Sequence, residues 1–281
     1  MKKYLQSIGA QCYLMFHTTP FWISLGIMSV YCALTYLKLI IQNKGMDISN
    51  IIRSGEWFAC FEYAPFADKF IYLFSIIVSM PFAFHYFDEK ENKSQIYGLF
   101  RSQKKVYYVG KLTACFLGGF IVMVLPLLWN VLCNALTIHN TRESYYDQQD
   151  TFLHNVFSPQ EGGANANILF PKIYVTHPTL YNIVFSIQIG ILAGLCGIMA
   201  FATAHFIKKY KLLIFLPNYA VFWLSNRYGL SLCNTNLNNL VVLQDCSGIS
   251  VWKAIFIYIG ILGISLSVLC LSIKREEKMM K

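Results

Sequence analysis

The chain has 281 residues, of which 56% are hydrophobic and 16% aromatic. Only 13% are charged, against roughly 25% in an ordinary soluble domain. The apolar residues gather in blocks of about 17–25, the length needed to cross a hydrocarbon core of ~30 Å. This composition excludes a soluble enzyme, a nucleic-acid-binding domain and a disordered chain, and it predicts a multi-pass protein of the cell membrane.

The chain order of these blocks predicts an all-α membrane protein. Residues 1–20 place apolar side chains at helical spacing among polar ones, which predicts an amphipathic helix in the membrane interface rather than a cleaved signal peptide. Six spans are expected after it, at about 21–40, 70–87, 110–138, 182–206, 212–226 and 254–273. The third span is long and contains Pro126, so we expect it to be tilted or kinked.

The distribution of basic residues predicts the orientation of these spans. Fifteen of the 23 Lys and Arg residues lie in the N-terminal segment, in the loop 88–109 with the start of the third span, in the segment after the fourth span and at the C-terminus. Basic residues collect on the cytoplasmic side of a membrane. We therefore expect both termini and the loop 88–109 inside, and the loop 139–181 outside. The net charge of +9 then reflects topology, and no nucleic-acid partner is expected.

The predicted spans contain no acidic residue, since all 14 Asp and Glu lie outside them. Proton- and sodium-coupled transporters need a titrating group at membrane depth. His85 and His205 lie near cytoplasmic span ends, where local hydrogen bonding is favoured over a proton relay. The chain also lacks GxSxG, HExxH and the phosphate-binding GxxxxGK[ST] pattern. These absences disfavour a membrane-embedded enzyme and indicate that ATP-driven work would depend on another polypeptide.

The spacing of cysteines and glycines leaves the disulfide pairing and the helix contacts open. The nine cysteines include no CxxC pair, and no metal site is predicted. Cys233 and Cys246 fall on the predicted outer side, where either a disulfide or two free thiols fits the sequence. Gly190 and Gly194 form a small-xxx-small pair that allows another helix to approach closely, either within the chain or from a second chain.

The loop 88–109 and the first residues of the third span contain acidic, amphipathic, basic and Gly-Lys segments in that order. These are Asp88, Glu89 and Glu91; Ile96, Tyr97, Leu99 and Phe100; Arg101, Lys104 and Lys105; and Gly110-Lys111. This order resembles the loop between the second and third spans of ABC type-2 exporter permeases. The resemblance extends to the interfacial N-terminal helix, the six spans, the internal termini and the lack of a nucleotide-binding motif.

The resemblance implies a permease subunit without its own ATPase domain. Such a subunit pairs with a second permease chain, identical or related, and with separate ABC ATPase subunits that hold ATP and Mg. This chain would then carry no catalytic residue and no cofactor. A short cytoplasmic helix docks into a cleft of the ATPase and transmits its closure. The implied docking surface has an apolar anchor of Ile96, Tyr97, Leu99 and Phe100 and a charged rim of Glu89, Glu91, Arg101 and Lys104.

Two alternatives stay open at this point. The loop 88–109 is either a docking element or a solvated loop whose charges only set topology. The whole chain is either an exporter permease or a non-transporting immunity or assembly subunit that binds a peptide at the outer membrane face. The sequence leaves the substrate undetermined, because amphipathic peptides, lipid-like molecules and small drugs all suit an aromatic-rich interior without acids.

Overall fold

The computed structural model describes residues 2–45, 58–60, 64–95, 97–98, 103–137, 169–170, 173, 177–207, 209–228, 237–242 and 251–279. Every regular element in these ranges is a helix, which confirms the all-α expectation. In chain order they are α1 (Lys2–Phe16), α2 (Thr19–Gln42), α3 (Ala67–Ser79), α4 (Ala83–Glu91), α6 (Lys104–Thr137), α9 (Pro178–Ala204), η4 (Lys211–Phe215), α10 (Leu216–Tyr228), η5 (Leu237–Leu240) and α11 (Val251–Met279). Cys233, Cys246 and most of the loop 139–181 lie outside these ranges.

Within the described residues, four helices are long and apolar enough to cross a membrane, namely α2, α6, α9 and α11. The count is five when α3 and α4 are taken as one bent span. The predicted span 212–226 is instead divided between η4 and α10. The helix changes from 3-10 to α at Leu216, directly before Pro217.

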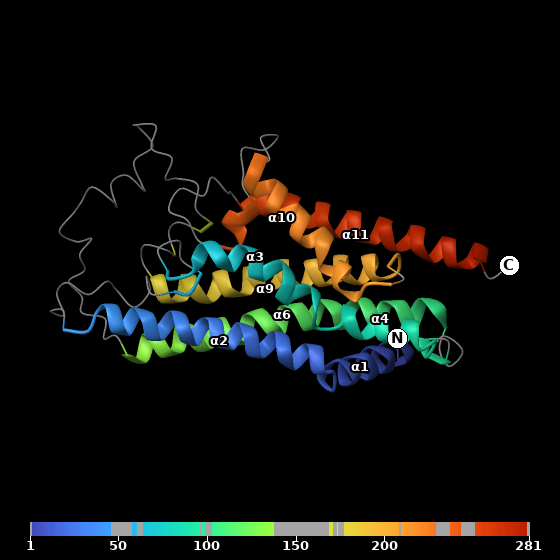
Figure 1. Ribbon diagram of the computed structural model, residues 1–281, viewed down its shortest axis with the longest axis horizontal. Helices are drawn as coiled ribbons and strands as arrows, with labels where there is room; N and C mark the ends of the chain where they lie inside the picture. Colours follow the sequence, from blue (N-terminus) through green and yellow to red (C-terminus); the bar gives the residue numbers. More distant parts are fainter. Residues whose placement is uncertain are drawn as a thin grey trace.

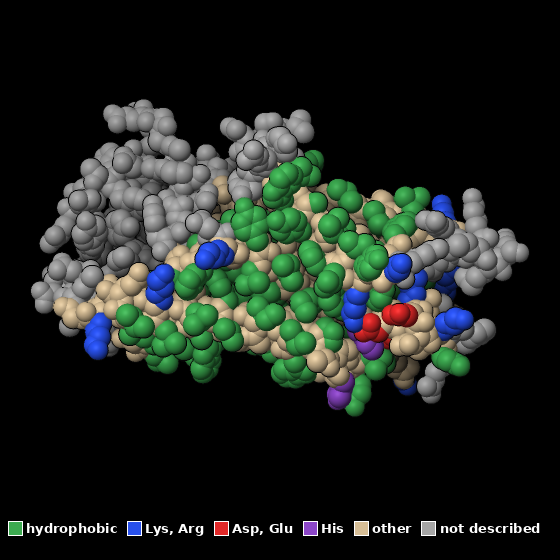
Figure 2. All heavy atoms as spheres, viewed as in Figure 1, with side chains coloured by type: hydrophobic (Ala, Val, Ile, Leu, Met, Phe, Trp, Pro, Cys, Tyr) green, Lys and Arg blue, Asp and Glu red, His purple; other side chains and the backbone are tan. Residues whose placement is uncertain are grey.

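The four long helices pack in succession, α2 on α6, α6 on α9 and α9 on α11 (Figure 1). Large apolar side chains remain exposed along α2 and α11, among them Trp22, Leu34, Trp252 and Phe256. Figure 2 shows hydrophobic side chains over the middle of the molecule. So large an exposed apolar surface is unfavourable in water and favourable in the lipid of a membrane.

Glycines bring α6 and α9 into close contact. A Cβ atom on Gly119 of α6 would lie 2.6 Å from the carbonyl oxygen of Ala193. A Cβ atom on Gly194 would lie 2.9 Å from the carbonyl oxygen of Phe116. The helix that faces the small-residue pair of Gly190 and Gly194 is therefore α6 of the same chain, and α6 continues as one helix through Pro126.

The first helix lies along the N-terminal half of α6. The Ser7 hydroxyl donates to the carbonyl oxygen of Val106 at 3.1 Å, and Met15 is completely buried. Other apolar side chains of α1 stay exposed, including Leu5, Tyr13 and Leu14. The start of α1 and the end of α11 lie towards the same end of the long axis, where α4 also lies (Figure 1).

The predicted span 70–87 is two helices rather than one. The chain turns by 42° between α3 and α4, and Pro81 lies in the break. Asn218 fixes the end of α3, because its Nδ2 donates to Ser79 Oγ at 2.8 Å and to the carbonyl oxygen of Cys196 at 3.0 Å. The helix after the turn, α4, includes the first four residues of the loop 88–109.

A single added methyl group tests the α6–α9 contact. Gly119→Ala should lower stability by about 1–3 kcal/mol, because the methyl group would press on the backbone of the facing helix. Gly260→Ala is the matched control, since nothing lies within 4 Å of a Cβ atom there. The melting temperature of the purified protein in detergent measures both changes. Equal melting temperatures for the two variants would contradict the close contact.

Candidate functional site

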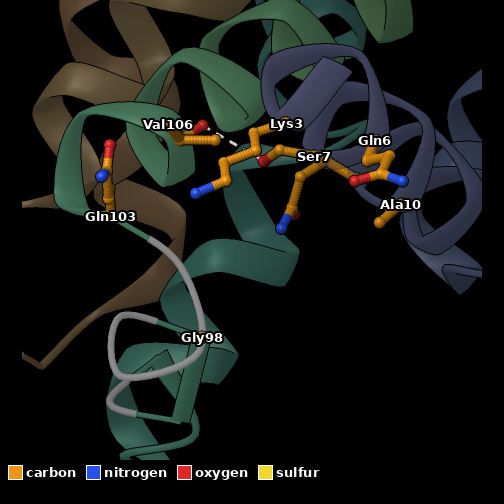
Figure 3. A pocket seen from close by; sticks show the side chains of 8 residues that line it. Lys3, Gln6, Ser7, Ala10, Gly98, Gln103 and Val106 are labelled. Carbon is orange, nitrogen blue, oxygen red and sulfur yellow. Dashed lines mark hydrogen bonds between the residues drawn. The ribbon is translucent and has the colours of Figure 1, made fainter.

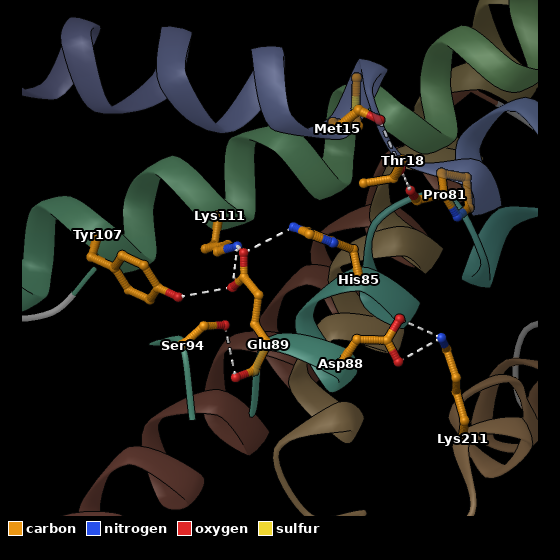
Figure 4. Close-up of polar contacts among 10 residues, drawn as sticks. All are labelled: Met15, Thr18, Pro81, His85, Asp88, Glu89, Ser94, Tyr107, Lys111 and Lys211. Atoms are coloured by element: carbon orange, nitrogen blue, oxygen red, sulfur yellow. Dashed lines mark hydrogen bonds and ion pairs between the residues drawn. The ribbon is translucent and has the colours of Figure 1, made fainter. Parts of the chain in front are cut away.

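Helix α4 directs three successive i, i+4 side-chain pairs at three different neighbours. Phe84 and Asp88 contact Lys211 of η4. Glu89 pairs with His85 and contacts Lys111 of α6. Tyr86 and Lys90 contact His205, directly after α9. Figure 4 shows the first two of these connections from opposite sides of α4. A helix of nine residues is thereby attached on three sides.

The contact with α6 is a buried ion pair. The Lys111 Nζ atom lies 2.7 Å from Glu89 Oε1 and 2.6 Å from Oε2. The Lys111 side chain is 0% exposed and that of Glu89 is 15% exposed. The Tyr107 hydroxyl donates to Oε2 of the same carboxylate at 3.2 Å, and His85 Nε2 lies 2.9 Å from its Oε1. The carboxylate of Glu89 is therefore surrounded by three polar groups of its own chain.

Aromatic rings complete the surroundings of the Lys111 ammonium. Its Nζ lies 4.6 Å from the ring centre of Phe82, 5.6 Å from that of Tyr107 and 6.0 Å from that of Tyr86. The negative faces of such rings attract a cation, and more so where water is excluded. The carboxylate and the rings together offset the cost of burying a charge in an otherwise apolar helix.

The contact with η4 is a second ion pair nearer to the surface. Lys211 Nζ lies 2.7 Å and 2.6 Å from the two carboxylate oxygens of Asp88. It also lies 5.3 Å from the ring centre of Phe84. The side chains of Lys211 and Asp88 are 33% and 43% exposed, so this pair is solvated and contributes less than the one at Lys111.

The third contact joins α4 to His205, the residue that directly follows α9. Nδ1 of His205 lies 3.1 Å from the carbonyl oxygen of Phe201, which can only accept. In the neutral ring Nδ1 therefore donates, and Nε2 accepts from the Tyr86 hydroxyl at 2.8 Å. Lys90 Nζ donates to the His205 carbonyl oxygen. Local hydrogen bonding, as favoured from the sequence, thus engages both ring nitrogens.

The segment after α4 leads back to the buried pair. The side chain of Tyr97 is 79% exposed. A Cβ atom on its neighbour Gly98 would lie 2.8 Å from Cε2 of Tyr107, so the backbone at Gly98 lies directly against that ring. The hydroxyl of the same Tyr107 side chain donates to Glu89. The Tyr107 ring therefore lies between the exposed segment at Tyr97 and Gly98, called the tip below, and the Glu89–Lys111 pair.

The residues expected to form the docking surface differ in their exposure to solvent. Glu91 is exposed at the end of α4, Tyr97 is exposed at the tip, and Lys104 is half-buried at the start of α6. Glu89 faces Lys111 inside the chain. The remaining members of the docking surface lie outside the described residues; they are Ile96, Leu99, Phe100 and Arg101.

Sequence reasoning missed the partners that hold α4 in place. Lys111 entered it only as one of the basic residues that set topology and as part of the Gly110-Lys111 segment of the resemblance, although a lysine seven residues after Lys104, within an apolar helix, is itself a signal for a buried counter-charge. His85 and Glu89 also stand four residues apart, the spacing of neighbours on one helix face. No comparable local signal marks Lys211 or His205 as a partner of α4.

No protein-family model, curated protein or solved structure matches the chain. Across the described ranges, no group of three or more His, Cys, Asp or Glu side chains is placed to hold a metal ion. In the described residues, the site consists of paired charges, aromatic rings and short helical segments. Such an arrangement holds three helices at set positions around α4.

Removing the charge of Lys111 tests the buried pair. Lys111→Met should cost about 3–5 kcal/mol, because it leaves the Glu89 carboxylate buried without its counter-charge. Adding Glu89→Gln should recover a large part of that loss. Lys211→Met is the matched control and should cost about 0–1 kcal/mol, since its partner is solvated. Thermal unfolding of the three variants in detergent ranks their losses of stability. An equal loss of stability in Lys211→Met and Lys111→Met would contradict the prediction.

Proposed function

We propose that the chain is the membrane permease subunit of an ATP-driven ABC exporter of the type-2 class. In this proposal it crosses the membrane six times with both termini in the cytoplasm, and a second permease chain pairs with it. Separate ABC ATPase subunits bind ATP and Mg. The observation that supports the proposal best is the connection from the exposed Tyr97 through Gly98 and Tyr107 to the buried Glu89–Lys111 pair.

This connection suits the transmission of force. An interface between two proteins needs an exposed apolar anchor within a polar rim, and an aromatic side chain as exposed as that of Tyr97 supplies one. Movement of this tip would act on α4 and α6 together, because the ion pair ties the two helices. The contacts of α4 with Lys211 and His205 would carry the same movement to η4 and to the end of α9.

The roles of the two acids differ in this proposal. Glu91 is exposed and is available to basic groups of the ATPase. Glu89 holds α4 against α6, so its substitution would disturb the position of the docking surface as well as its charge. The residues Ile96, Leu99, Phe100, Arg101 and Lys104 remain proposed contacts of the ATPase.

A photo-crosslinking experiment tests the proposed partner. A photoreactive amino acid at position 97 should crosslink the full-length chain to an ATP-hydrolysing subunit in native membranes. The same group at Tyr210, which is also exposed, is the matched control and should give at least fivefold less of that product. Mass spectrometry identifies the captured chain. Capture of only a peptide added from the outer side would favour the immunity subunit, and failure to capture any ATPase from position 97 would contradict the docking role.

Cysteine accessibility tests the six-span orientation. In a variant without native cysteines, a cysteine at Ser94 should react with a membrane-impermeant maleimide only after the membrane is opened. A cysteine at Ser158, in the loop 139–181, should react in intact cells. This pattern follows from the bias of Lys and Arg towards the cytoplasmic side. The reverse pattern, or labelling of both sites from one side, would overturn the orientation.

A further inference from the structure

A cleft of about 670 Å³ opens between α1 and the start of α6. Figure 3 shows its labelled wall, in which the Ser7 hydroxyl of α1 points to the carbonyl oxygen of Val106 at the start of α6. Among the described residues, the lining contains no acidic side chain and comprises Lys3, Gln6, Ser7, Ala10, Gln11, Gly98, Gln103 and Val106. One cation and three amides therefore face a space that the described chain does not fill.

Gln11 is the most deeply placed of these polar groups. Its side chain is only 9% exposed, and its Oε1 atom has no hydrogen-bond partner among the described residues. A buried amide normally has its hydrogen bonds satisfied. The last torsion of a glutamine is broad and roughly two-fold, so the amide can present either of its polar atoms to a group bound in the cleft.

The position of the cleft fits the headgroup layer of a membrane. On α1, the exposed side chains of Leu5, Tyr13 and Leu14 are apolar, while Lys3 and Gln6 line the cleft. A helix that exposes apolar side chains as well as basic and polar ones suits the boundary between acyl chains and headgroups. A group bound in the cleft would thus lie at the depth of lipid phosphates.

We propose that this cleft binds the headgroup of an anionic phospholipid. Lys3 supplies the charge that a phosphate ester attracts. Gln11, Gln6 and Gln103 supply amides that exchange hydrogen bonds with headgroup hydroxyls. The volume is within the range of about 300–1,000 Å³ that small-molecule sites occupy, and it leaves room for bridging water. The lipid would connect α1 to the segment at Gly98, next to the exposed tip.

The test uses the purified full-length chain in nanodiscs of phosphatidylcholine that contain increasing fractions of phosphatidylglycerol. Bound lipid is counted by native mass spectrometry, and the melting temperature is followed in parallel, because a lipid that binds the folded chain raises it. Lys3→Gln and Gln11→Leu should each weaken phosphatidylglycerol retention at least fivefold. Lys2→Gln removes the same charge from the neighbouring residue, which does not line the cleft, and should stay within twofold of the unmodified chain.

Soluble glycerol 3-phosphate distinguishes a lipid from a free phosphate ester. It should leave the melting temperature unchanged at concentrations where phosphatidylglycerol raises it. Equal losses for Lys2→Gln and Lys3→Gln would show general charge attraction and would overturn the site. Retention of phosphatidylglycerol at the level of the unmodified chain in Lys3→Gln, or binding of glycerol 3-phosphate as tight as that of the lipid, would overturn it as well. The Lys3→Gln result stands even if Gln11→Leu fails to fold, since Lys3 is exposed.

Discussion

The buried ion pair between Lys111 and Glu89 determines how one end of the helical bundle is built. A charge without a partner is very costly in an apolar interior, so Lys111 of α6 requires a carboxylate at its side. The chain supplies it by turning 42° after α3, which lays α4 against α6 and brings Glu89 within 2.6 Å of Lys111. The contacts of α4 with η4 and with the end of α9 depend on the same turn.

The pair also connects distant parts of the molecule. Helix α6 has 34 residues, which corresponds to about 51 Å at 1.5 Å per residue. Close contact at Gly119 and Gly194 couples α6 to α9 along this length. In the proposed coupling, a displacement of α4 would reach the opposite end of the bundle through these two closely packed helices. This continuity is the physical basis of the proposed coupling.

The long helices were predictable because apolar runs of membrane length have few other stable structures. The turn at Pro81 was not predicted, because hydropathy does not register a change of helix direction. The partners of α4 were also hidden: Lys111 and Lys211 lie 22 and 123 residues from the acids that they bind. Only the three-dimensional packing of α6 and η4 around α4 brings these charges together.

The central claim is that α4 transmits movement through the Glu89–Lys111 pair. The most direct measurement is the distance between spin labels at Ser94, beyond α4, and Leu136, near the end of α6, in a complex with the proposed ATPase. Trapping the ATP-bound state should shift this distance, and the shift should be lost in the Glu89→Gln/Lys111→Met variant while ATP hydrolysis continues. An equal shift in that variant would contradict the claim.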